Sequence, residues 1–190
     1  MHKQPKITAQ TKQNFMKAFM DLNRHTPIEK ITVKSLSDKA GYNRATFYNY
    51  FADVYDLYES VELYVFRKIK AKIEANIRHV DAQQNYIENF TSIAFQYKSY
   101  LEIILRNPNS DYFTTQVKTY LTNYWIQELD LPKNDIKVQY QLNFYLSAVM
   151  ATVSHWLRNQ NDMTITELAA FLQTMSSQGI LPNILSKMTK

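Results

Sequence analysis

The chain has 190 residues, a formal net charge of +5 and no cysteine. The lack of cysteine excludes a disulfide framework and thiolate chemistry, and it fits a reducing, cytoplasmic compartment. Only 2 glycines and 5 prolines interrupt a widespread helical periodicity, and strand signals are few, so the sequence predicts an all-α protein.

No stretch of about 18 apolar residues is present, so we expect no membrane-spanning helix and no membrane partner. The first residues, Met1 to Lys6, are not followed by an apolar core, so we expect no signal peptide.

The positive charge is concentrated near the N-terminus. Residues 1–50 carry nine Lys and Arg and three Asp and Glu, a net charge of +6, whereas the remainder carries 13 and 14, a net charge of −1. A basic segment beside a nearly neutral body is the pattern expected of a protein that binds a polyanion. A solvated basic surface without such a partner is the alternative.

A first amphipathic helix is predicted over about residues 8–25. Phe15, Ala18, Phe19 and Leu22 repeat at the spacing of one helical face. Pro27 disfavours helical geometry at the preceding residue and ends the element. We expect this helix to pack against the segment that follows it.

Residues 31–51 are predicted to form two short helices around a tight turn. Val33, Leu36 and Ala40 lie on one helical face, Thr32 stands at the N-cap position, and Gly41 follows the last apolar residue. Glycine adopts the left-handed turn conformation without a Cβ penalty.

A second short helix is predicted to begin at Arg44, with Asn43 as its cap and with Phe47 and Phe51 buried. Two short helices that cross steeply at a glycine turn are typical of the helix-turn-helix, whose second helix can enter a major groove. Together with the first helix, they predict a three-helix module over residues 1–52.

The remaining residues, 53–190, are predicted to form a second helical domain, to which the resemblance described below assigns regulation and dimerisation. Its first element is a connecting helix over 53–79, whose apolar residues recur every four positions without an intervening Pro or Gly. Further helices are expected over about 87–105, from about 111, over 136–157 and over 166–175.

The last two of these helices are apolar over most of their circumference. Such a helix needs packing partners on most sides, so self-association across a two-fold axis is favoured. The alternative is that they form only the core of their own chain.

The helix-turn-helix stretch closely resembles the DNA-binding domain of TetR-family transcriptional regulators over about residues 8–60. The matching features are the Ala40-Gly41 turn, the run from Thr46 to Phe51 and the Asp56-Leu57 pair that follows it. The resemblance implies a homodimeric repressor with two recognition helices in successive major grooves of a palindromic operator. A small-molecule or protein effector, bound in the C-terminal domain, would shift the connecting helix and release the DNA.

The resemblance also assigns DNA contacts to ten residues of the two short helices. Thr32 and Ser35 would contact phosphate, Arg44 can pair with guanine, and core packing is the alternative for the tyrosines. Many relatives carry Lys at the position of Val54, and its absence removes one expected phosphate contact. The predicted DNA-binding residues are Thr32, Lys34, Ser35, Asn43, Arg44, Ala45, Thr46, Tyr48, Asn49 and Tyr50.

Nothing in the sequence favours catalysis. The four histidines are dispersed without metal-ligand spacing, and no phosphate-binding glycine loop or nucleophile motif is present. We therefore expect no enzyme, no metal and no cofactor. Aromatic residues of the C-terminal domain are candidates to line a pocket for an apolar or cationic ligand, with core or dimer packing as the alternative. They are Tyr97, Phe113, Tyr120, Tyr124 and Phe144.

A different class of function fits the same residues. The chain could be a helical protein-interaction module in which the helix-turn-helix is structural. It would then bind no DNA and would form a complex with a folded partner instead.

Overall fold

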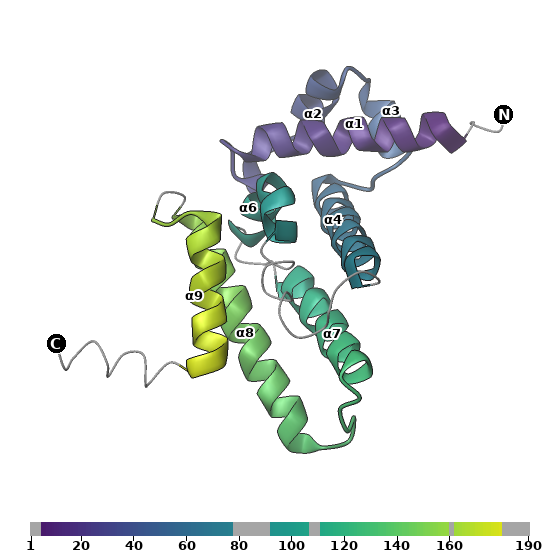
Figure 1. The fold of residues 1–190 in the computed structure, drawn as a ribbon. Coiled ribbons are helices and arrows are strands. Elements are labelled where there is room, and N and C mark those ends of the chain that lie inside the picture. The colour runs from purple at the N-terminus through teal and green to yellow at the C-terminus, as the bar shows by residue number, and fades with distance from the viewer. Residues whose placement is uncertain (1–4, 78–91, 107–110, 160–161, 180–190) are drawn as a thin grey trace. The chain divides into compact units, whose positions relative to one another are not determined.

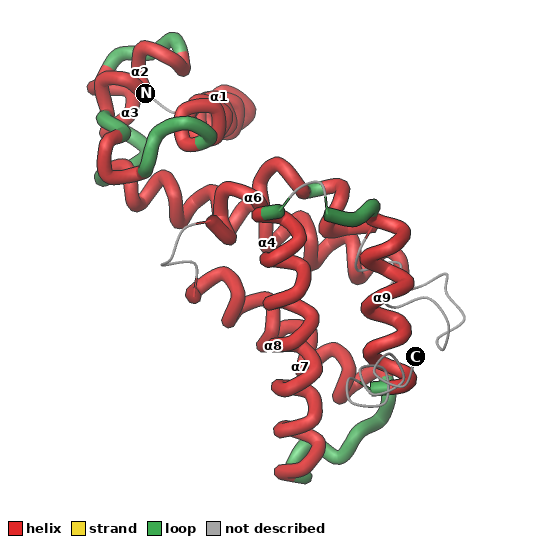
Figure 2. Tube along the Cα trace, turned by 90° about the vertical axis from the view of Figure 1, so that its left-hand side faces the viewer, coloured by secondary structure: helices red, strands yellow, loops and turns green. Residues whose placement is uncertain are grey.

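The computed structural model describes residues 5–77, 92–106, 111–159 and 162–179, and within these ranges every regular element is a helix (Figures 1 and 2). The predicted all-α class is confirmed. Packing divides the chain into two compact units, Met1–Val65 and Phe66–Lys190. None of the described helices is long and apolar enough to cross a membrane.

The first unit contains the predicted helix-turn-helix. Its elements are α1 (Pro5–Asn23), a 3-10 turn (Ile28–Lys30), α2 (Val33–Ala40), α3 (Arg44–Tyr48) and the start of α4 (Val54–Ile77).

Aromatic packing places α3 against α1. The Phe15 ring of α1 meets the edge of Phe47 at 5.4 Å between centroids and that of Phe51 at 6.1 Å. All three side chains are buried, together with Leu36 of α2 and Leu57 of α4. The three-helix module therefore has one shared apolar core, which fixes the orientation of its exposed faces.

The second short helix ends earlier than predicted, at Tyr48 instead of Phe51. The next helix, α4, is capped by Asp53, whose Oδ1 accepts the N–H groups of Tyr55 at 2.8 Å and Asp56 at 2.9 Å. The Asp56 carboxylate in turn accepts the Ala52 N–H at 2.7 Å. Phe51 is buried as expected, but it lies in this turn.

α4 is one uninterrupted helix of 24 residues, about 36 Å long. Its buried stripe is Leu57, Val61, Val65, Ile69 and Ile73. The sequence predicted this helix to reach His79, which lies outside the described residues.

The second unit contains the rest of α4 and the helices that follow it. Residues 92–96 are helical and are followed by a turn at Tyr97, so the single helix predicted over 87–105 is interrupted there, and residues 87–91 lie outside the described part. The other elements are α6 (Lys98–Arg106), α7 (Asp111–Glu128), α8 (Ile136–Arg158) and α9 (Ile165–Gln178).

α8 is the central helix of the second unit, with α7 on one side and α9 on the other (Figure 1). The Trp156 indole N–H donates to the Met163 carbonyl at 2.8 Å, which fixes the chain reversal between α8 and α9. Thr164 and Glu167 form a reciprocal capping box at the start of α9. The hydrogen bonds from Thr164 lower the pKa of the Glu167 carboxyl, because they favour its charged form.

Candidate nucleic-acid interface and regulatory surface

The N-terminus of α2 is closed by a capping box between two of the residues predicted to contact phosphate. The Thr32 hydroxyl accepts the Ser35 N–H at 3.1 Å, and the Ser35 hydroxyl accepts the Thr32 N–H at the same distance. The Ser35 hydroxyl also donates to the Thr32 carbonyl at 2.9 Å. Both hydroxyls therefore stabilise the helix end, and Lys34 stands exposed between them.

The turn between α2 and α3 depends on Gly41, whose φ of 75° and ψ of 32° are left-handed. A Cβ built at this position would meet no atom within 4 Å, so the requirement for glycine is one of backbone conformation and not of space. The Tyr42 hydroxyl accepts a hydrogen bond from the Asn14 amide at 3.0 Å, which ties the turn to α1.

α3 is short, and its first turn is held by a side-chain cap. The Asn43 Oδ1 accepts the Thr46 N–H at 2.7 Å and the Thr46 hydroxyl at 2.9 Å. This pair fixes the first turn of α3, on which Arg44 and Ala45 are exposed. Phe47 faces the core, so the helix is anchored on one side and open on the other.

None of the ten residues predicted to contact DNA is buried. Tyr48 is 60% exposed, with its ring edge against Phe47, whereas Tyr50 is half-buried and packs on Phe51. The structure thus brings the ten residues onto the exposed sides of two adjacent helices and their flanking turns. Their contacts with DNA remain a prediction.

The five aromatic residues predicted to line a ligand pocket lie on several elements of the second unit. Phe113 is 1% exposed and belongs to the core of the second unit. Tyr120 and Tyr124 of α7 stack on each other at 6.4 Å. Tyr97 lies in the turn before α6. That these residues line a ligand pocket remains a prediction.

Tyr120 is a contact between α7 and the second half of α4. Its ring receives the edge of Phe66 at 6.1 Å, and Lys70 Nζ lies 5.4 Å from its centroid. Its hydroxyl lies 3.5 Å from a Glu74 carboxylate oxygen. Burial, followed by the charge and the hydrogen bond of Glu74, raises the pKa of Tyr120 to about 12, so the hydroxyl stays protonated at neutral pH.

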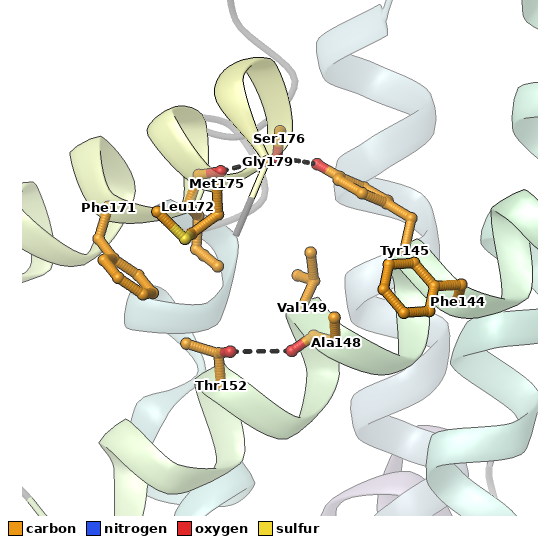
Figure 3. Close-up of a pocket in the computed structure, with 10 residues that line it drawn as sticks. All are labelled: Phe144, Tyr145, Ala148, Val149, Thr152, Phe171, Leu172, Met175, Ser176 and Gly179. Atoms are coloured by element: carbon orange, nitrogen blue, oxygen red, sulfur yellow. Dashed lines mark hydrogen bonds between the residues drawn. The ribbon is translucent and has the colours of Figure 1, made fainter. Parts of the chain in front are cut away.

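A cavity of about 680 Å³ opens between α8 and α9, and Phe144 is the one predicted pocket residue that lines it (Figure 3). Its other lining residues include Val149 of α8 and Phe171, Leu172 and Met175 of α9. Sequence reasoning found the apolar surplus of these two helices but not the hollow between them, because the hollow depends on how far apart the helices pack.

No group of three or more His, Cys, Asp or Glu in the described ranges is arranged to hold a metal ion.

Comparison with known proteins agrees with this architecture. Residues 96–178 match the TetR-type family model described as "Transcriptional regulator C-terminal region". No curated protein sequence matches the chain.

Several solved structures have the same fold. A putative TetR-family regulator from Syntrophomonas wolfei superposes with a TM-score of 0.69 at 17% identity, over 88% of this chain and 95% of that one. The fatty acid degradation regulator FadR from Bacillus halodurans gives a TM-score of 0.68 at 15% identity, over 92% and 96%. FadR from Bacillus subtilis, solved in complex with stearoyl-CoA, gives 0.61 at 16% identity, over 88% and 98%.

The fold, with its exposed helix-turn-helix, is the one seen in these solved TetR-family structures. Together with the family model that matches residues 96–178, it agrees with the resemblance to TetR-family transcriptional regulators that the sequence predicted.

Proposed function

We propose that the chain is a sequence-specific DNA-binding regulator that acts as a homodimeric repressor on a palindromic operator. Residues 1–52 would bind DNA, and residues 53–190 would dimerise and receive a small-molecule or protein effector that releases the operator. The observation that carries the proposal is that none of the ten predicted contact residues is buried and that seven are exposed, while the three helices share one apolar core.

In this proposal α3 enters the major groove and α2 abuts the phosphate backbone. Arg44 is exposed beside the Asn43–Thr46 cap, where a guanidinium can pair bidentately with guanine O6 and N7. Lys34 lies next to the α2 N-terminus, whose partial positive charge favours a phosphate. Because the Thr32 and Ser35 hydroxyls are bonded to each other, they would hold this helix end more than bind phosphate themselves.

The proposed dimer uses the exposed face of α8 and α9. Neither Asp, Glu, Lys nor Arg occurs in α8 between Lys137 and Arg158, or in α9 after Glu167. Interface cores are depleted of charged residues in this way, and a water-facing helix rarely is.

The effector is proposed to carry a long apolar chain. The support comes from the two structurally similar regulators named FadR, one of which was solved with stearoyl-CoA. A protein effector is the alternative.

The second candidate function is the interaction module with a structural helix-turn-helix. One observation favours it: the hydroxyl groups of Thr32, Ser35 and Thr46 and the amide oxygen of Asn43 all have partners within the chain. Pull-down with and without nuclease separates the two functions, since a protein partner survives nuclease and a DNA-mediated one does not.

The direct test of DNA binding is a gel shift with the DNA upstream of the chain's own gene, at low and at moderate salt. We expect a discrete complex that survives an excess of unrelated duplex DNA. Absence of any complex at low salt across that region would contradict the proposal.

A further inference from the structure

The turn between α3 and α4 has an unfavourable charge for a DNA contact. Residues 49–56 include Asp53 and Asp56 and contain no Lys or Arg. Both carboxylates accept backbone N–H groups near the start of α4. Tyr50, a predicted DNA contact, lies in this turn. A phosphate that approaches Tyr50 therefore needs a cation from another part of the three-helix module.

Lys12 of α1 places a cation at this turn. Its Nζ lies 5.9 Å from the centroid of the Phe51 ring, and the Tyr50 ring lies 6.5 Å from the same ring. Lys12 is exposed, and the described part of the chain contains no ion pair that involves it. The ammonium group is therefore open to an anion from outside the chain.

The apolar core of the module holds α1 in this position. Lys12 precedes Phe15 by three residues, so the two side chains lie on about the same side of α1. Phe15 packs against Phe47 of α3 and against Phe51. The N-terminal half of α1 consequently lies beside α3 (Figure 1).

We propose that Lys12 is a further DNA-binding residue, whose ammonium group binds a backbone phosphate beside Tyr50 at the α3–α4 turn. The inference rests on the proposed function and adds α1 to the helices that contact DNA. A phosphate contact carries no sequence information by itself, so Lys12 contributes affinity and orientation while base reading stays with α3.

The alternative role for Lys12 is packing on Phe51 alone. A cation beside an aromatic ring can stabilise a fold, although Phe51 is already 2% exposed and packs against Phe15 and Phe47. The two roles differ in their dependence on salt. A lysine that binds phosphate displaces a counterion from the DNA, and a lysine that only packs on a ring does not.

The first test is Lys12→Gln, measured by fluorescence anisotropy over a salt series. The two probes are the duplex upstream of the chain's own gene and an unrelated duplex of the same length. We expect the dissociation constant to rise about 5- to 10-fold on both at ~0.1 M salt, and the slope of log affinity against log salt to become shallower by about 0.9. Lys12→Arg keeps the charge and should keep the wild-type slope.

The matched control is Lys17→Gln. Lys17 is also exposed on α1, but it lies about 140° around the helix from Lys12. Its substitution removes the same formal charge from the module, so it should leave the salt slope at the wild-type value. An equal change of slope in Lys17→Gln would attribute the effect to net charge and overturn the contact at Lys12.

The outcomes separate this contact from the proposed function. A wild-type chain that binds neither duplex at low salt overturns both. A wild-type complex whose affinity and salt slope are unchanged in Lys12→Gln overturns the contact alone. A weaker complex with an unchanged slope and a lower melting temperature would assign Lys12 to packing on Phe51 and also overturn the contact.

A second test uses the absence of native cysteine. Lys12→Cys and Lys17→Cys are each conjugated to iron–EDTA, which cleaves the DNA backbone within reach of the tether. We expect the Lys12→Cys conjugate to cut the upstream duplex at discrete positions and the Lys17→Cys conjugate to cut it weakly. Absent or uniform cutting by the Lys12→Cys conjugate, in a complex that a gel shift shows to be intact, would overturn the proposal.

Discussion

Two exposed cations, Arg44 and Lys34, have different proposed contacts with DNA. Arg44 stands on the first turn of α3, the helix proposed to face bases, and Lys34 stands on the first turn of α2, proposed to face the phosphate backbone. The capping contacts of Asn43–Thr46 and Thr32–Ser35 fix these two turns. The two positive charges are therefore carried on rigid supports.

Replacing Arg44 with Ala should cost about 1–3 kcal/mol of operator binding and relax the preference for one sequence, because a bidentate base contact is lost. Lys34→Ala should weaken operator and unrelated DNA alike, with a shallower dependence of affinity on salt. Fluorescence anisotropy on both duplexes over a salt series measures the two effects. Equal losses on both duplexes for Arg44→Ala would remove its base-reading role.

Gly41→Ala should destabilise the chain by about 1–2 kcal/mol, because an L side chain at φ 75° is strained even where space is free. Gly41→Asn should cost less, since asparagine tolerates the left-handed region. Chemical denaturation of the three proteins gives the comparison. An asparagine variant as unstable as the alanine one would show that something other than backbone conformation is at work.

α4 buries a carboxyl group, that of Glu62, beside its apolar stripe. It carries one continuous buried stripe, yet Glu62 is only 3% exposed, and its Oε1 has no hydrogen-bond partner among the described residues. Burial raises the pKa of Glu62, the nearby charge of Glu59 raises it further, and a hydrogen bond with Tyr58 opposes both effects. Such a charge within an otherwise apolar face makes the helix less stable than its pattern would allow.

Glu62→Gln should therefore stabilise the chain at pH 7. The folded-state pKa of Glu62 lies above its ordinary value of 4.5, so the cost of burying its charge is present at neutral pH, falls as pH drops through the raised pKa, and is absent below 4.5. The advantage of the variant in melting temperature should shrink over the same range. Glu59→Gln, at an exposed position of the same helix, is the control and should have a smaller effect. A Glu62→Gln variant that melts lower than wild type at pH 7 would contradict this account.

At the scale of the whole molecule, the proposed function needs two copies at a fixed spacing. One helix-turn-helix covers a single half-site, and successive major grooves on one face of DNA are about 34–36 Å apart. The proposed dimer would set that spacing. DNA affinity and dimerisation should then be lost together.

Insertion of five base pairs between the half-sites of the operator should abolish dimer binding, because it turns one half-site to the opposite face of the duplex. Insertion of ten base pairs restores the face but not the distance, so it should recover binding only weakly. Gel shifts with the three duplexes measure this. Unchanged affinity for the five-base-pair insertion would mean that each module binds independently.

The local structure of the helix-turn-helix follows from its own residues. The caps and the turn follow from residue type, as Thr32, Asn43 and Gly41 show. The apolar spacing of α2, α4 and α8 places these helices within a few residues of their observed ends. Capping and periodicity act over one or two helical turns, so they can be read from the chain itself. The exposed set on α2 and α3 follows in the same way, since Phe47 alone decides which side of α3 faces the core.

Other features depended on contacts between residues distant in sequence. The aromatic residues of the second unit are an example: Phe113 lies in the core, Tyr120 contacts α4, and Phe144 lines the α8–α9 groove. The number of aromatic residues is known from the composition, but the distance between helices is set only by tertiary packing. The sequence by itself determined most of the helices, their caps and the exposed face that we propose binds DNA. The tertiary structure decided where the apolar surplus lies and that it encloses a groove, because a cavity is a property of two helices and not of either one.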